Sequence, residues 1–286
     1  MGFLLFKKNQ KLLVISLLLA FSINGQAKQN QSFEAKRIIA LSPHAVELLY
    51  AIGAGDRIVG TVEYADYPKE ALSIPRIGNY VGIKIEKVLA LKPDLIVIWK
   101  NGNKTTDLNK LKSLGLTIHN SQSNNIIDIT KDLQTLGELT GLQDNAKKII
   151  EKMKSRYEKI VTRYSNKSEV NVFYQVWHEP LMSVGANGWI ESLIKNCGGK
   201  NIFDQSDTPY PQVSLESVLA KNPEVIIIPH HSGNVGAKTE IWEKWPEITA
   251  IKNNQYFILD GDLLHRYTPR ALDGLELLCN RIDRAR

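Results

Sequence analysis

Six histidines are the side chains of this 286-residue sequence with the widest chemical range, because imidazole binds metals and transfers protons near neutral pH. A site built from His44, His178 and a carboxylate, or one that uses His230, would indicate a metal-dependent enzyme. His230 and His231 are adjacent, so a strand would point them to opposite faces, and a loop is expected there instead. All six histidines are expected at surface or loop positions.

Motifs for covalent catalysis are missing from the sequence. There is no Walker A loop, no Gly-x-Ser-x-Gly elbow, no His-Glu-x-x-His pair and no complete dinucleotide fingerprint. The glycines of Gly53-Ala54-Gly55 mark the end of a helix. The sequence therefore predicts a protein that is not an enzyme and that carries neither a cofactor nor a resident metal.

Residues 1–27 have the three parts of a cleavable secretory signal. Basic residues at 7, 8 and 11 precede an apolar stretch at 12–23, and small Gly25 and Ala27 predict cleavage after Ala27. A membrane-spanning helix would need about 20 apolar residues. No cysteine follows the apolar stretch for a lipid anchor, so the predicted location is the periplasm of a Gram-negative cell.

Net charge and cysteine content fit this location. The formal charge of +6 falls to about +3 without the three leader lysines, which is too mild to predict a nucleic-acid partner. The two cysteines, Cys197 and Cys279, are most simply paired in an exported protein, although two buried thiols or a metal site are the alternatives. A bridge closing about 80 residues would contribute roughly 4 kcal/mol.

The elements that position these side chains occur in two copies. Residues 85–99 and 215–229 share seven identical residues at a constant offset of 130, including Glu86 with Glu216 and Pro93 with Pro223. Each copy predicts a short helix, a proline and then a wholly apolar strand. Such strands are typical of parallel sheets covered on both faces, so we expect two homologous α/β lobes.

Other segments complete this plan. Further strands are expected at 37–41, 57–60, 116–119, 170–176 and 256–259, and Ser42-Pro43 predicts a helix start. Apolar residues at spacings of three and four from Leu142 to Tyr164 predict a helix of roughly 35 Å that joins the lobes and limits hinge motion. The predicted organisation is a signal peptide (1–27), an N-terminal lobe (28–138), a bridging helix (139–166) and a C-terminal lobe (167–286).

Several segments also carry a family resemblance. They are RIIALSPHAVELLYAIG at 37–53, YADYP at 64–68, IEKVLALKPDLIVIW at 85–99, CGGKNIF at 197–203, PYPQVSLESVLAKNP at 209–223 and YTPRALDGLELLC at 267–279. The sequence resembles the helical-backbone (class III) substrate-binding proteins of ABC importers and, among them, the periplasmic cobalamin (vitamin B12) receptors. This resemblance implies two Rossmann-like lobes, bridged by one long α-helix, with the ligand in the cleft between them.

The resemblance also implies which residues contact cobalamin, a flat macrocycle fringed with amides. They are the aromatic residues Tyr64, Tyr80, Trp99 and Tyr210, together with Met182, Asp262 and Arg266. Tyr80 and Tyr210 replace familiar tryptophans and Met182 replaces a phenylalanine, but all three keep apolar surface, and Trp177 lies nearby in sequence. Core packing is the alternative for the aromatic residues, and a surface ion pair is the alternative for Asp262 with Arg266.

Glu86 and Glu216 have two readings. A glutamate in the first turn of a helix stabilises it by up to about 1 kcal/mol. In the family, the matching glutamates dock on arginine pockets of the membrane permease. The predicted function is therefore a receptor, monomeric when free, that delivers cobalamin to an ABC permease and its ATPase. Two alternatives remain: a haem or ferric-siderophore receptor, in which His265 could bind haem iron, and a metal-dependent periplasmic enzyme.

Overall fold

The computed structural model describes residues 33–231 and 239–286. Residues 34–286 form one compact unit. The predicted signal peptide and its cleavage site lie outside the described residues. Within the described ranges, no helix combines the length and apolar character needed to cross a membrane.

The first half of the chain builds a five-stranded, wholly parallel sheet. Its strands are β1 (Ile38–Ala40), β2 (Ile58–Val62), β3 (Arg76–Gly78), β4 (Leu95–Ile98) and β5 (Ile118–Asn120), in the order β3-β2-β1-β4-β5. Helices α1 (Pro43–Ala51), α2 (Ile85–Ala90) and α3 (Thr105–Ser113) and the 3₁₀ turns η1 (Gly55–Arg57) and η2 (Lys69–Ser73) connect them. Ile38 and Ile39 belong to different hydrophobic clusters, so this sheet is buried on both faces.

The second half builds a parallel sheet of four strands. They are β6 (Val170–Tyr174), β9 (Gly199–Asn201), β10 (Val225–His230) and β11 (Tyr256–Asp260), in the order β11-β10-β6-β9. A short antiparallel hairpin consists of β7 (Trp177–His178) and β8 (Leu181–Met182). The helices are α6 (Trp189–Asn196), α7 (Leu215–Lys221), α8 (Glu240–Glu243), α9 (Thr249–Lys252), α10 (Gly261–His265) and α11 (Ala271–Asp283).

The two sheets repeat one another, which confirms the predicted internal duplication. The order β2-β1-β4-β5 in the first sheet matches β9-β6-β10-β11 in the second. The offset of 130 also places the start of α2 on that of α7 and the start of β4 on that of β10. In both copies the acid after the shared proline caps the neighbouring strand, since Asp94 accepts from the Arg37 N–H (3.0 Å) and Glu224 from the Asn171 N–H (2.8 Å).

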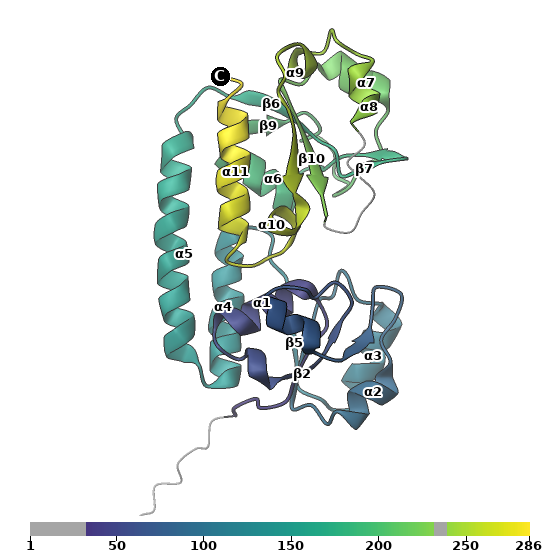
Figure 1. The fold of residues 1–286 in the computed structure, drawn as a ribbon, viewed down its shortest axis with the longest axis vertical. Coiled ribbons are helices and arrows are strands. Elements are labelled where there is room, and N and C mark those ends of the chain that lie inside the picture. Colours follow the sequence, from purple (N-terminus) through teal and green to yellow (C-terminus); the bar gives the residue numbers. More distant parts are fainter. Residues whose placement is uncertain (1–32, 232–238) are drawn as a thin grey trace, which may run out of the picture. The chain divides into compact units, whose positions relative to one another are not determined.

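Two helices connect the halves: α4 (Ile126–Thr140) and α5 (Gln143–Tyr164). Near its start, α5 contacts the first half, where the Asn145 amide donates to the carbonyl of Ile52 (3.0 Å). Further along it contacts the second half, through Tyr157 on Asn196 (3.1 Å) and through Arg156 on α11. Figure 1 shows α5 running beside both α4 and α11. The sequence analysis missed α4, and the lobe boundaries at 138 and 167 stay predictions.

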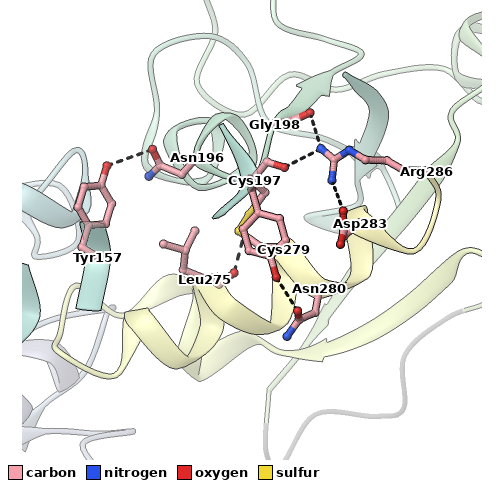
Figure 2. The surroundings of a disulfide bond; sticks show 10 residues. Tyr157, Asn196, Cys197, Gly198, Leu275, Cys279, Asn280, Asp283 and Arg286 are labelled. Carbon is pink, nitrogen blue, oxygen red and sulfur yellow. Dashed lines mark hydrogen bonds and ion pairs between the residues drawn. A yellow bond between two sulfur atoms is a disulfide. The ribbon is translucent and has the colours of Figure 1, made fainter. Parts of the chain in front are cut away.

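One disulfide bond joins Cys197 to Cys279, as predicted (S–S 2.02 Å), which excludes the alternatives of free thiols and a metal site. Figure 2 shows that it links the end of α6 to α11, and both sulfurs belong to fully buried residues. The C-terminal Arg286 closes the same region by donating to the carbonyls of Cys197 (2.9 Å) and Gly198 (3.0 Å). The disulfide therefore fixes the helices that pack on the second sheet.

Candidate functional site

A pocket of about 320 Å³ lies where the two halves meet. The first half contributes Pro43, His44, Tyr64, Asp66 and Trp99, and the second half contributes His231, Asp262, His265 and Arg266. Pro43 and Trp99 closely follow β1 and β4, and His231 and Asp262 closely follow β10 and β11. The pocket is therefore at the carboxyl ends of parallel strands from both sheets, where α/β proteins present their ligand sites.

The seven predicted ligand contacts divide into two groups. Tyr64, Trp99, Asp262 and Arg266 line the pocket, whereas Tyr80, Met182 and Tyr210 do not. Tyr80 is 76% exposed in the loop after β3. Met182, in β8, pairs with Gln212 on the segment that carries Tyr210. The contact of each residue with a ligand stays a prediction.

Aromatic rings pack together next to the pocket, and two of them, His44 and Trp99, line it. The ring centroid of His44 lies 5.5 Å from that of Trp99 and 5.2 Å from that of Tyr267. Tyr267 in turn contacts Trp189, at 4.8 Å between centroids. Burial, followed by the nearby phenol of Tyr210, raises the pKa of Tyr267 to about 12. The indole N–H of Trp99 is buried and has no hydrogen-bond partner among the residues that the structure describes.

Tyr64, which also lines the pocket, has a strained backbone conformation. Its φ is 64°, in the left-handed region, which costs a residue other than glycine on the order of 1 kcal/mol or more. The guanidinium of Arg266 donates to its carbonyl oxygen (3.4 Å). The phenol ring is 67% exposed, so it remains available to cover a ligand.

Arg266 does not form the surface ion pair that was the sequence alternative. Only 8% exposed, it pairs with Glu47 (3.0 Å) and Asp66 (2.8 Å) of the first half and with Asp262 (3.1 Å) of the second. Burial alone would lower the pKa of Arg266, but its hydrogen bonds to Asp66 and Glu47 raise it above the ordinary value. Burial raises the pKa of Glu47 in spite of these bonds. The cluster ties the two halves together.

Sequence reasoning missed Glu47, although a signal was present. Glu47 is the one acid in PHAVELLYA, the α1 segment, and it is 4% exposed. An acidic side chain on the apolar face of a helix indicates a buried cationic partner, because an unpaired buried charge is strongly unfavourable. A second partner is Arg270, at 3.2 Å from Glu47, which also stacks on Tyr67.

The expectation that the histidines are surface or loop residues was wrong at several positions. His119 lies in strand β5 with its side chain 14% exposed, and its Nε2 contacts Asp132 (3.0 Å). His44 is buried at 4% exposure on α1, where burial lowers its pKa to about 4, and it contacts the Ser42 hydroxyl (3.2 Å). His265 lies in α10, where burial and then the neighbouring His231 lower its pKa to about 3. His230 ends strand β10 instead of lying in a loop. Strand β10 extends further than its apolar core, because it pairs with β11 up to Asp260.

Four side chains of the second half form a hydrogen-bonded chain in the pocket wall. Asp262 contacts His231 Nδ1 (2.8 Å), His231 Nε2 contacts His265 Nδ1 (3.0 Å), and His265 Nε2 contacts the hydroxyl of Tyr174 (2.8 Å). Burial alone would raise the pKa of Asp262, but the His231 hydrogen bond and the Arg266 charge outweigh it, and the pKa lies below its ordinary value. Asp262 is therefore an acceptor at neutral pH. Within 33–231 and 239–286, no three or more metal-ligating side chains gather into a metal site.

The glutamates of the repeat lie away from this pocket. Glu86 is in the first turn of α2 and Glu216 in the first turn of α7, and both side chains are exposed. Neither carboxylate forms an ion pair with another described residue. The internal repeat thus places one unpaired carboxylate at the equivalent point of each half.

Comparison with known sequences links this architecture to a family. The sequence profile of the periplasmic binding proteins matches residues 38–263. A vitamin B12-binding protein of Vibrio cholerae is 40% identical over 248 residues, which are 86% of this chain and 89% of that protein. A vitamin B12-binding protein of Photorhabdus laumondii is 32% identical over 247 residues, which are 86% of this chain and 88% of that protein.

Solved structures agree with this result. The crystal structure of the periplasmic vitamin B12 binding protein of Vibrio cholerae matches with a TM-score of 0.81 and 38% identity, covering 88% of this chain and 98% of that one. A periplasmic heme-binding protein of Roseiflexus matches with a TM-score of 0.77 at 19% identity, covering 88% and 99%. The second likeness shows the fold alone. Together they confirm the predicted fold class, two α/β halves joined by a long helix.

Proposed function

The chain belongs to the periplasmic binding protein family, and on that premise we propose that it captures cobalamin in the pocket between its halves. It then delivers the vitamin to the permease of an ABC importer, whose ATPase drives uptake. The protein itself performs no covalent chemistry, and it works in the periplasm as a monomer after loss of residues 1–27. Relatives of 32–40% identity that are named for vitamin B12 support this ligand.

The charge balance of the pocket is the observation that carries this choice. Arg266, the guanidinium that lines the pocket, is already paired with three carboxylates, of which Asp66 and Asp262 line the pocket beside it. Counting Arg270 as well, the cluster holds three carboxylates against two guanidinium groups. A ligand that brings further negative charge would meet a site whose cations are already neutralised.

The excess of carboxylates over guanidinium groups in this cluster favours a ligand without added negative charge. The edge of cobalamin carries neutral amides, which can bond to carboxylates and to guanidinium groups alike. Haem carries two carboxylates and ferric siderophores are commonly anionic, so both would require unpaired cations. The rings of Trp99 and Tyr64, which line the pocket, supply aromatic surface of the kind that a flat macrocycle needs.

Delivery requires a second surface, for which we propose Glu86 and Glu216. Each is an exposed acid at the start of a short helix, and the internal repeat places them at equivalent points. A permease with two related subunits would meet one carboxylate with each. Such charge pairs set orientation and association rate more than affinity.

Calorimetric titration with cyanocobalamin, with haemin run in parallel, tests the proposed ligand. The protein is produced from the full sequence with its own leader in an oxidising compartment, so that Cys197 and Cys279 pair. We expect saturation at about one cobalamin per chain with submicromolar affinity, which corresponds to a binding free energy beyond about −8 kcal/mol. Binding of haemin without any binding of cobalamin would overturn the proposal and retain only the receptor role.

A further inference from the structure

The Asp262–His231 pair has the arrangement found behind metal-bound histidines. A carboxylate that accepts from one ring nitrogen fixes the tautomer, leaves the lone pair on the other nitrogen and makes it more basic. Here Asp262 Oδ1 lies 2.8 Å from His231 Nδ1, and Asp262 Oδ2 lies 3.1 Å from the Arg266 guanidinium. In the neutral form of His231, the lone pair is therefore on Nε2.

His231 is also accessible from the pocket. It is one of the lining residues, and its side chain is 36% exposed, in contrast to the buried His44. Gly261 makes room for the ring, because a Cβ at that position would lie 2.7 Å from His231 Cε1 and Nε2. Because Gly261 has no side chain, the imidazole of His231 can pack directly against the start of α10.

His265 contacts the Nε2 atom of His231. Its Nδ1–H donates to this nitrogen over 3.0 Å, and its own Nε2 accepts from the Tyr174 hydroxyl. This is a bond between two imidazole rings, with no carboxylate of the described residues on the Nε2 side of His231. A metal centre with a replaceable ligand can displace such a bond, and the released His265 N–H can then donate to a carbonyl on the amide fringe of the ligand.

We propose that His231 Nε2 coordinates the cobalt of a bound corrinoid at its exchangeable axial position. This inference rests on the proposed function and deepens it, because it selects the subclass of corrinoids whose axial ligand is labile. In aquocobalamin the water leaves as the imidazole nitrogen binds, with no change in the oxidation state of cobalt(III). In cyanocobalamin the cyanide stays bound, so no coordination by His231 follows.

Absorption spectra of the two corrinoids bound to the full-length product test this coordination. We expect the bands of aquocobalamin to move to those of the reference complex of aquocobalamin with free imidazole, while the bands of cyanocobalamin stay in place. His231→Ala should abolish the shift and should lose at least tenfold more affinity for aquocobalamin than for cyanocobalamin. His178→Ala, which alters a histidine outside the pocket, is the matched control and should retain both the shift and the affinities.

Two further measurements keep the result unambiguous. His231→Gln retains a side chain able to hydrogen-bond with Asp262, and it replaces the alanine variant if thermal unfolding shows that the latter is misfolded. Unshifted bands of aquocobalamin on a saturated parent protein would overturn the inference, as would a shift that persists in both His231 variants. Binding of cyanocobalamin in that case would leave the proposed function standing, whereas failure of both corrinoids to bind would overturn both.

Discussion

Arg266 and Glu47 join the two halves of the protein across the pocket. Arg266 Nη1 lies 3.0 Å from Glu47 Oε1, and the two side chains are 10% and 3% exposed. Within the described part of the chain, the other carboxylate oxygen of Glu47 is buried without a hydrogen-bond partner. The pair therefore brings a residue beyond α10 into contact with the middle of α1, although it leaves part of the buried carboxylate unsatisfied.

Removal of Arg266 should destabilise the protein more than removal of an exposed arginine. Arg266→Met leaves the buried Glu47 with Arg270 as its remaining partner, and breaking a buried pair costs about 3 kcal/mol. The control is Arg156→Met, whose ion pairs with Asp273 and Glu276 are exposed and contribute about 1 kcal/mol or less. Urea unfolding measures the free energy of unfolding of both variants. An equal decrease in the two would show that the buried pair stabilises the protein no more than the exposed pairs do.

The double variant Glu47→Gln with Arg266→Met shows how much of the stability loss in Arg266→Met comes from the unpaired Glu47 charge and how much from the lost packing of Arg266. Replacing the carboxylate by an amide removes the uncompensated charge, so part of the stability should return relative to Arg266→Met alone. A double variant that is less stable by the sum of the two single losses would show that the two side chains do not act together.

Acidification should destabilise the folded protein through its buried histidines. The pKa of His44 falls from 6.5 to about 4 and that of His265 to about 3, so below pH 6.5 the unfolded chain binds protons that the folded chain does not. Stability is then lost as pH falls from 6.5, until the folded histidines also protonate. At pH 5 the loss from His44 is about 2 kcal/mol.

A variant series isolates this contribution from that of the carboxylates. The free energy of unfolding of His44→Gln should decline by about 2 kcal/mol less than that of the parent between pH 7 and pH 5. His178→Gln, which lies outside the pocket, should follow the parent curve. Parallel curves for the parent and His44→Gln would show that His44 is not held neutral by burial.

The position of the Trp99 ring should control ligand affinity. A Cβ at Gly102 would lie 1.8 Å from Trp99 Cε3, so Gly102→Ala must displace the indole from the pocket wall. We expect Gly102→Ala and Trp99→Ala to weaken cyanocobalamin binding to a similar extent, about tenfold to a hundredfold, since an aromatic contact of this size contributes about 1–3 kcal/mol. Gly188→Ser is the control, since that glycine has a φ of −96°, which other residues adopt freely, and no neighbour within 4 Å of its Cβ position.

The calorimetric comparison of these three variants decides the role of Trp99. Full affinity in Trp99→Ala would show that the indole is a packing residue and not a ligand contact. Full affinity in Gly102→Ala alone would mean that the loop relaxes without moving the ring.

The fold could be predicted wherever the local sequence carries the pattern. The segments 85–99 and 215–229 each specify helix, proline and buried strand without reference to the other half, and both formed as expected. The missed strands β3 and β9 lie at the edges of their sheets, where each pairs with one neighbour. The short β9, Gly199–Asn201, has no apolar run that would predict a strand. It forms through its pairing with β6, which the local sequence does not show.

The site was less predictable because its contacts join distant parts of the chain. Trp99 follows β4 of the first sheet and Asp262 follows β11 of the second, so the place of each at the carboxyl edge of its own sheet could be inferred from the sequence. The bond of Arg266 to Glu47 spans 219 positions, and the edge-to-face contact of Tyr267 with Trp189 depends on how α10 packs against α6. No local spacing encodes such contacts, and the buried acid of α1 was the one available signal.

The paired glutamates should matter for delivery and not for capture. Glu86→Ala combined with Glu216→Ala removes one exposed carboxylate from each half, and neither residue lines the pocket, so cyanocobalamin affinity should stay within about twofold of the parent. Uptake of cobalamin by cells that depend on this protein should fall by about tenfold or more, because the charge pairs that orient the receptor on the permease are lost. Glu151→Ala with Glu158→Ala removes the same charge from exposed positions on α5 and should leave uptake unchanged. Unimpaired uptake in the Glu86 and Glu216 double variant would show that these residues only stabilise the helix ends and do not dock on the permease. An equal decrease in uptake in the α5 double variant would indicate a general effect of net charge.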